Sequence, residues 1–169
     1  LITSVTFRLK KNFDPNLTYS NLAQTLENNI SISSQDIINN VTNIRKKKLP
    51  NPSLVPNVGS FFKNIEMNEE ELNKFIKNNP NSPFFKKKEI YKIPSAWLID
   101  QCGYKSIKYK TLSMHKEQAL VMINSFNKDD SNTSNRIDLD DVIFFSNKIK
   151  KSVHEKFEVK LDIEPQIIS

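Results

Sequence analysis

A serine that follows a glycine is the first feature of this sequence that could support chemistry. Gly59 and Ser60 stand in a segment rich in proline and asparagine, residues 49–64, directly before Phe61 and Phe62. Glycine lets the backbone turn sharply or approach a ligand closely. The Ser60 hydroxyl could therefore act on a bound molecule, or the pair could be only a turn with the two phenylalanines in the core. The segment lacks the second glycine and the strand–helix context of a nucleophile elbow.

A carboxylate near the end of the chain is the second candidate. Val159, Leu161 and Ile163 alternate with Lys160, Asp162 and Glu164, and this period of two predicts a strand with its polar side chains on one face. Glu164 could then line a site or simply face solvent. Four further polar residues reveal no chemistry by their spacing alone: Lys105, Gln118, His115 and His154. We expect the two histidines to be ordinary polar residues.

The net positive charge of the chain favours polyanionic partners but does not indicate which kind of polyanion. The 169 residues include 25 Lys and Arg against 19 Asp and Glu, a formal net charge of +6. Such a surface attracts nucleic acid, anionic lipid or nucleotide diphosphates. Much of the charge lies in the runs 46–48 and 86–88. These runs could equally be solvated lysines with no partner.

Cysteine content and hydropathy exclude several classes of protein. Cys102 is the single cysteine, so an internal disulfide and a cysteine-rich zinc site are both excluded, and a reducing compartment is favoured. No apolar run approaches the length that spans a bilayer. We expect no metal site.

The elements that must position these residues are predicted to mix strands and helices. We expect strands at 4–10, 118–124 and 159–164, because apolar residues alternate or form a short compact run there. We expect helices from Ser33 or Ser34 to 48, from Asn68 onward with Glu71 as its capping partner, between Pro94 and Gly103, and from Asp138 to about 156. No clean βαβ repeat is present, which predicts the α+β class, with a small mixed sheet packed against helices.

Several stretches together resemble the MurB family of flavin-dependent reductases of peptidoglycan synthesis. The resemblance covers nearly the whole chain, and its most specific part is the block from Gly59 to Asn64 that follows Lys48-Leu49-Pro50. The other matching stretches are 17–19, 95–105, 115–121 and 157–164. The resemblance implies an enzyme in which NADPH reduces FAD, and the flavin reduces UDP-N-acetylglucosamine enolpyruvate to UDP-N-acetylmuramate.

The same resemblance implies roles for single residues. Ser60 matches the proton donor to the substrate carbon, and Glu164 matches the catalytic glutamate. Five residues match positions that hold the UDP-sugar: Tyr19, Lys48, Asn64, Lys105 and Gln118. Arg45 matches, more weakly, a position near the flavin, and the remaining flavin contacts are expected outside this chain.

Four departures from the family pattern affect these assignments. Val58 replaces a smaller residue, Ile65 a common proline, and Ser106 a common glycine, which could alter the turn that holds Lys105. The order Glu164-Pro165 reverses the usual one. The ungapped match from Phe157 still places Glu164 at the catalytic position.

The resemblance also implies an organisation and a setting. We expect residues 1–12 to be the end of an FAD-binding domain and residues 13–169 to be the substrate-binding domain, so that this chain alone is inactive. We expect a cytoplasmic enzyme of cell-wall synthesis, and hence of cell shape and division, monomeric at full length and without nucleic-acid or membrane partners. The alternatives are a non-catalytic module that binds a nucleotide-sugar or another polyanion, and a nucleic-acid-binding domain. The latter needs exposed aromatic residues within a basic face.

Overall fold

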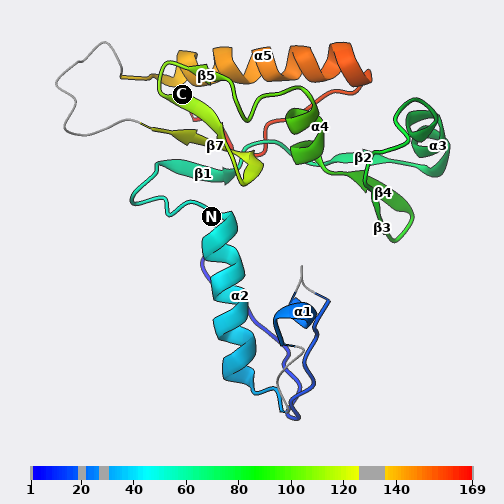
Figure 1. Ribbon diagram of the computed structural model, residues 1–169, viewed down its shortest axis with the longest axis vertical. Coiled ribbons are helices and arrows are strands. Elements are labelled where there is room, and N and C mark those ends of the chain that lie inside the picture. Colours follow the sequence, from blue (N-terminus) through cyan, green and yellow to red (C-terminus); the bar gives the residue numbers. More distant parts are fainter. Residues whose placement is uncertain (1, 19–21, 27–30, 126–135, 169) are drawn as a thin grey trace. The chain divides into compact units, whose positions relative to one another are not determined.

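The computed structural model describes residues 2–18, 22–26, 31–125 and 136–168 of the chain (Figure 1). The chain divides into two compact units, Leu1–Lys48 and Leu49–Ser169. Each unit has its own apolar cluster, and each is described by itself below. Within the described residues, no helix is long and apolar enough to cross a membrane.

The described part of the first unit contains two helices, α1 (Leu22–Leu26) and α2 (Ser34–Lys48). The Ser33 hydroxyl accepts a hydrogen bond from the Asp36 amide, and the Asp36 carboxylate accepts one from the Ser33 amide, which satisfies donors at the start of α2. The buried residues of this unit's small core are Leu22, Leu26 and Ile44. The predicted helix to residue 48 is confirmed.

The strand predicted at residues 4–10 is wrong. These residues have no strand hydrogen bonding, and every one of them is exposed. Val5, Phe7 and Leu9 are 64%, 76% and 82% exposed. A strand requires a neighbouring strand to satisfy its backbone groups, and no described segment of this chain pairs with residues 4–10.

The second unit contains two antiparallel sheets. The larger has the strand order β1-β7-β6-β5 and the smaller the order β2-β4-β3. The strands of the larger sheet are β1 (Asn57–Ser60), β5 (Lys108–Tyr109), β6 (Leu112–His115) and β7 (Gln118–Asn124). The strands of the smaller sheet are β2 (Ile65–Met67), β3 (Phe85–Lys87) and β4 (Ile90–Ile93). The α+β prediction is confirmed, with two antiparallel sheets where one mixed sheet was expected.

Three helices complete the described part of the second unit: α3 (Glu69–Asn78), α4 (Ser95–Gln101) and α5 (Leu139–Phe157). Figure 1 shows α5 lying along the larger sheet and α3 beside the smaller one. Phe145, Ile149 and Val153 of α5 are fully buried, as their helical spacing predicted. A nucleic-acid-binding face would need exposed aromatic rings. Phe61 and Phe62 are buried like Phe145, so none of these three rings can stack on a base at the surface.

The predicted starts of α3 and α5 are confirmed by reciprocal capping boxes. Asn68 accepts from the Glu71 amide while Glu71 accepts from the Asn68 amide. Asp138 and Asp141 exchange the same pair of bonds at the start of α5. Each box satisfies backbone donors that the first helical turn would otherwise leave unpaired. These local bonds explain why the sequence fixes where both helices begin.

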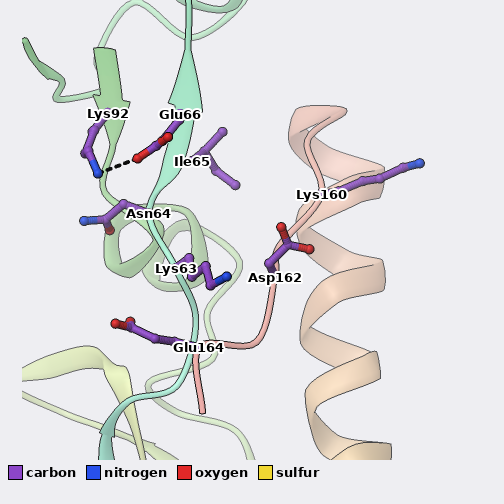
Figure 2. A pocket seen from close by; sticks show the side chains of 8 residues that line it. All are labelled: Lys63, Asn64, Ile65, Glu66, Lys92, Lys160, Asp162 and Glu164. Carbon is purple, nitrogen blue, oxygen red and sulfur yellow. Dashed lines mark ion pairs between the residues drawn. The ribbon is translucent and has the colours of Figure 1, made fainter. Parts of the chain in front are cut away.

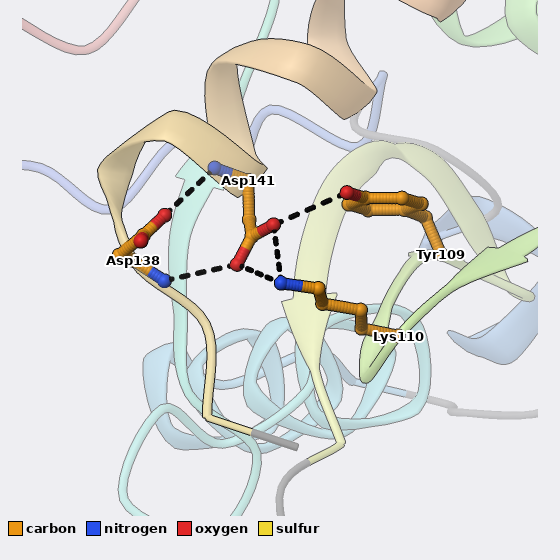
Figure 3. Close-up of polar contacts among 4 residues, drawn as sticks. All are labelled: Tyr109, Lys110, Asp138 and Asp141. Carbon is orange, nitrogen blue, oxygen red and sulfur yellow. Dashed lines mark hydrogen bonds and ion pairs between the residues drawn. The ribbon is translucent and has the colours of Figure 1, made fainter. Parts of the chain in front are cut away.

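Asp141 also joins α5 to the turn between β5 and β6. Its carboxylate lies 2.6 Å from the Lys110 ammonium and accepts a hydrogen bond of 3.2 Å from the Tyr109 hydroxyl (Figure 3). Lys110 has a positive φ of 51°, a conformation that costs energy for a residue with a side chain. The hydrogen bond from Lys110, followed by the bonds from Asp138 and Tyr109 and then by the charge of Lys110, holds the pKa of the Asp141 carboxyl below its ordinary value, against the opposing effect of burial.

Replacing Asp141 with Asn is expected to destabilise the second unit in a pH-dependent manner. A carboxyl whose pKa is lowered by folding adds stability above its unfolded pKa, about 3.9, and loses it as the pH falls through the lowered folded value. The urea midpoint of Asp141→Asn should therefore lie below that of the unmodified chain at pH 7, and the gap should narrow below about pH 3.9. Fluorescence of Trp97, the single tryptophan, reports the midpoint. Asp140→Asn, an exposed change in the same turn, is the control. An equal gap at every pH would contradict this account.

Candidate functional site at the crossing of the Gly-Ser loop and the C-terminal segment

Residues 61–63 and 162–164 run antiparallel to each other and join distant parts of the chain. The Lys63 amide donates to the Asp162 carbonyl at 2.9 Å, and the Glu164 amide donates to the Phe61 carbonyl at 2.9 Å. Phe62 and Ile163 form an isolated β-bridge between these two bonds. The predicted final strand is thus an extended segment with one bridge. Its predicted alternation is confirmed, because Lys160, Asp162 and Glu164 are exposed while the intervening residues are buried or half-buried.

This crossing brings Ser60 close to Glu164 along the backbone, because Ser60 precedes the residue whose carbonyl binds the Glu164 amide. The strand that carries Ser60 is irregular: Asn57 pairs with Ile123 and Ser60 with Val121, so one extra residue stands in β1. Gly59 lies at this β-bulge with a φ of +76°, and its amide donates to the Asn57 side chain at 3.0 Å. Bulges change the direction in which a side chain points. Ser60 is exposed whereas Phe61 is buried.

A pocket of about 690 Å³ opens beside the crossing (Figure 2). Its walls come from residues 63–64, which follow Gly59 and Ser60, from strands β2 and β4, and from residues 160–164 near the end of the chain. The lining residues are Lys63, Asn64, Ile65, Glu66, Lys92, Lys160, Asp162 and Glu164. Of the residues proposed from sequence, Asn64 and Glu164 line the pocket, and Figure 2 shows their side chains extending to the same side. Ser60 adjoins the pocket through the backbone but is not part of its lining.

The start of α4 fixes the orientation of Asn64. Pro94 occupies the N-cap position and supplies no side-chain cap, so the Ser95 amide takes its acceptor from 31 residues away, the Asn64 side-chain oxygen at 3.1 Å. Buried Ser95 also donates its hydroxyl to the Lys63 carbonyl. An amide N–H must face an oxygen, which directs the Asn64 nitrogen, with its two donor hydrogens, away from the helix. Asn64 can therefore donate to a ligand in the pocket.

The charges around the pocket balance. Three lysines face three carboxylates among its lining residues. Glu66 and Lys92 stand directly opposite each other on β2 and β4 and form an ion pair of 2.5 Å. The hydrogen bond from Lys92, followed by its charge, holds the pKa of the Glu66 carboxyl below its ordinary value. The pocket is thus highly polar, with both signs of charge available to a ligand.

The two other predicted residues of this unit lie outside the pocket lining. Lys105 follows α4, and its ammonium pairs with the Asp100 carboxylate at 2.8 Å. Gln118 is the first residue of β7 and is half-buried. Because β1 and β7 are antiparallel and Ser60 pairs with Val121, Gln118 lies beyond Ser60 in the direction of Phe62. The register therefore brings Gln118 toward the crossing, whereas Lys105 is held by its own helix.

The remaining predicted residues belong to the first unit. Arg45 and Lys48 lie in the basic last turn of α2 and are exposed. Tyr19 lies outside the described residues. The roles of these three residues stay predictions, since the two units are described separately.

Sequence reasoning missed most of the charged lining. Asp162 and Lys160 share the exposed face with Glu164, and the alternation that identified Glu164 could have identified them too. Glu66 and Lys92 could not be found in this way, because only the pairing of β2 with β4 brings them together. No cluster of three or more potential metal ligands occurs among the described residues.

Asn64 should therefore be needed to stabilise α4, independently of any ligand. Asn64→Ala removes the acceptor for the Ser95 amide and should lower the free energy of unfolding by about 1 kcal/mol, the usual value of an N-cap. Asn64→Asp keeps an oxygen at the helix start and should cost less than about 0.5 kcal/mol. Urea unfolding followed by Trp97 fluorescence measures both. Equal losses in the two variants would show that the side-chain oxygen is not the stabilising group.

Comparison with known proteins places this arrangement in a family. The family model described as UDP-N-acetylenolpyruvoylglucosamine reductase, C-terminal domain, matches residues 51–168. The reductase of that name from Aliivibrio fischeri is 35% identical over 164 residues, covering 97% of this chain and 44% of the relative. Those of Neisseria meningitidis and Flavobacterium johnsoniae are 35% and 34% identical, covering 98% and 99% of this chain and 46% and 48% of the relatives. This chain thus spans about half the length of these relatives, and it belongs to the UDP-N-acetylenolpyruvoylglucosamine reductase family through that family's C-terminal domain.

Proposed function

We propose that this chain is the substrate-binding part of a reductase of peptidoglycan synthesis. The proposed reaction converts UDP-N-acetylglucosamine enolpyruvate to UDP-N-acetylmuramate in the cytoplasm. The observation that carries the proposal is the crossing of residues 61–63 with 162–164. It joins the stretch that carries Ser60 and Asn64 to the distant segment that carries Glu164, and Asn64 and Glu164 line a pocket of about 690 Å³. Each of these groups has a defined task in such a reaction.

Ser60 is the proposed proton donor. Hydride addition to C3 of the enolpyruvyl group leaves an electron-rich carbon at C2, whose charge is shared with the carboxylate as an enolate-like species. An uncharged serine hydroxyl is a very weak acid, so it can protonate only such a strongly basic centre, and it must be held in position to do so. Gly59 supports this, because the bulge it permits sets the direction of the next side chain.

Glu164 and Asn64 are the proposed partners of Ser60 at the substrate. The Glu164 backbone is fixed by the Phe61 carbonyl, so its carboxylate can orient the serine hydroxyl or relay a proton to it. The Asn64 amide, oriented by α4, can donate to an oxygen of the UDP-sugar. Gln118, Lys105, Lys48 and Tyr19 remain proposed contacts of the same ligand. An ammonium suits a diphosphate because it is a compact point charge.

The resemblance to the reductase family implies that the main flavin-binding region lies outside this chain. Flavin-dinucleotide cradles hold the pyrophosphate on backbone amides, where a glycine lets the chain approach closely. The chain has two glycines, Gly59 and Gly103, which lie far apart in the sequence, so it contains no glycine-rich segment of this kind. We therefore propose that FAD, and with it the reducing power of NADPH, is held by parts of a longer protein, with Arg45 as a possible contact from this chain.

Residues 1–12 are the proposed end of the flavin-binding domain, with residues 13–169 as the substrate-binding domain. Support comes from Val5, Phe7 and Leu9, which alternate as in a strand yet are all well exposed. Pairing with a sheet of the flavin domain would satisfy the backbone and cover one apolar face. The alternative function, a non-catalytic nucleotide-sugar module, shares the pocket but requires no hydroxyl beside it.

Replacing Ser60 with Ala in the full-length protein distinguishes these functions. Loss of a general acid costs about 10²- to 10⁴-fold in rate, so kcat for UDP-N-acetylmuramate formation should fall by that factor with little change in KM. Ser53→Ala, an exposed serine of the same loop region, should have no effect. Product formation at the unmodified rate by Ser60→Ala would rule out the assigned acid.

The 169-residue chain by itself should bind FAD poorly and should not turn over. The chain contains no glycine-rich segment, and its first residues present exposed apolar side chains. Purified chain is expected to lack flavin absorbance and to leave NADPH unoxidised in the presence of FAD and substrate. A yellow, active preparation would overturn the proposed division of labour.

A further inference from the structure

The β-bulge that precedes Ser60 is held by a side chain that has no role in the reaction described above. Asn57 is the first residue of β1 and is half-buried. Its side-chain oxygen accepts a hydrogen bond of 3.0 Å from the Gly59 amide, and its side-chain nitrogen donates to the Val55 carbonyl at 2.8 Å. The same nitrogen lies 3.5 Å from the Pro50 carbonyl. Asn57 thus connects the bulge to the loop before β1.

The bond to the Gly59 amide meets a need that the bulge creates. Two residues of β1, Val58 and Gly59, stand opposite the single residue Met122 of β7. A bulge disrupts the ladder where the extra residue stands, so the bulged backbone has to find other partners. Gly59 has a left-handed φ of +76°, and an asparagine two residues earlier can accept its amide as a backbone turn would. Asn57 therefore stabilises the bulge over a regular strand.

The bulge lies between two fixed points of the backbone. Before it, the Asn124 amide donates to the Pro56 carbonyl at 3.0 Å, and after it the Phe61 amide donates to the Leu120 carbonyl at 2.8 Å. The segment between these bonds includes Ser60, and it can change its path while the rest of the sheet stays in place. Because Ser60 is exposed, the packing of the core does not fix its hydroxyl. The backbone of the bulge therefore sets the direction of that side chain.

We propose that Asn57 is a positioning residue for the proton transfer: by holding the Gly59 amide, it maintains the bulge that directs the Ser60 hydroxyl at the substrate carbon. This inference rests on the proposed function, in which Ser60 is the proton donor. In that step the serine O–H bond breaks as the C–H bond at C2 forms, and the serine oxygen then recovers a proton from water. Asn57 does not line the pocket beside the crossing, so its loss should slow the proton transfer and leave substrate binding largely unchanged.

The test compares variants of the full-length protein by the steady-state kinetics of UDP-N-acetylmuramate formation. Asn57→Ala removes the acceptor for the Gly59 amide, and its kcat should fall about 10- to 100-fold, with KM changed less than about twofold. Asn57→Ser keeps an uncharged acceptor that forms the same turn more weakly, so it should recover much of the lost rate. Asn51→Ala is the matched control and should retain the full kcat. The Asn51 side chain accepts from the Ser53 amide at 3.0 Å in the same kind of turn.

A double-variant cycle with Ser60→Ala separates positioning from a general effect on the protein. When Ser60 is already alanine, adding Asn57→Ala should cost less than about a further twofold in kcat, because the hydroxyl that it positions is gone. Urea unfolding of the 169-residue chain, followed by Trp97 fluorescence, verifies that each variant is folded. If Asn57→Ala does not fold, Asn57→Leu takes its place in every comparison, since leucine keeps the volume of the side chain and also lacks the acceptor.

Three results would overturn the positioning role. The first is an unchanged kcat in Asn57→Ala, and the second is an equal loss in Asn51→Ala, which would reduce the effect to the stability of the loop. The third is an equally large loss with and without Ser60, which would mean that Asn57 does not act through the serine. Unmodified activity of Ser60→Ala would instead contradict the proposed function itself, so the two failures can be told apart.

Discussion

The antiparallel crossing of residues 61–63 with 162–164 is the constraint on which the rest of the site depends. Two backbone bonds of 2.9 Å and one β-bridge hold together segments about 100 residues apart. The crossing is anchored in the core by buried Phe61, Phe62 and Leu161, and Leu161 alternates with its exposed neighbours Lys160 and Asp162. Burial of these apolar side chains, at roughly 25 cal/mol per Å², therefore sets the register that also places Glu164. A slip by one residue would turn Glu164 inward and Ile163 toward the pocket.

The helix α4 is linked to the same site because a pocket residue, Asn64, accepts a hydrogen bond from the first turn of the helix. Its own N-cap, Pro94, has no acceptor to offer, and Asn64 supplies one. The stability of the helix and the orientation of the amide are consequently coupled through a single side chain. The core reinforces this coupling, since Leu98 and Ile99 of α4 are fully buried in the cluster that also contains Phe62 and Ile93. The amide is thus positioned by packing as well as by its hydrogen bond.

Features encoded by neighbours in the chain were predictable, and features made by distant pairing were not. The capping boxes at Asn68 and Asp138, and the strand 118–124, could be predicted because their signals lie within a few residues. The strand at 4–10 was wrong because alternation indicates a strand only where a partner exists. In the site, resemblance and alternation identified Asn64 and Glu164, which line the pocket. The Glu66–Lys92 pair and the capping of α4 by Asn64 depend on tertiary contacts, for which one sequence holds no local signal.

The pocket lining has no excess of positive charge, although the chain as a whole is basic. The chain carries a formal charge of +6, yet the pocket lining holds equal numbers of lysines and carboxylates. The lysine run 86–88 lies outside that lining, so it can attract an anion over the distance of a screening length but cannot select it. Selection must then come from fixed donors such as the Asn64 amide and from carboxylates that oppose a wrongly placed anion. A lining with equal numbers of lysines and carboxylates can distinguish ligands by the positions of their charges more than by their total charge.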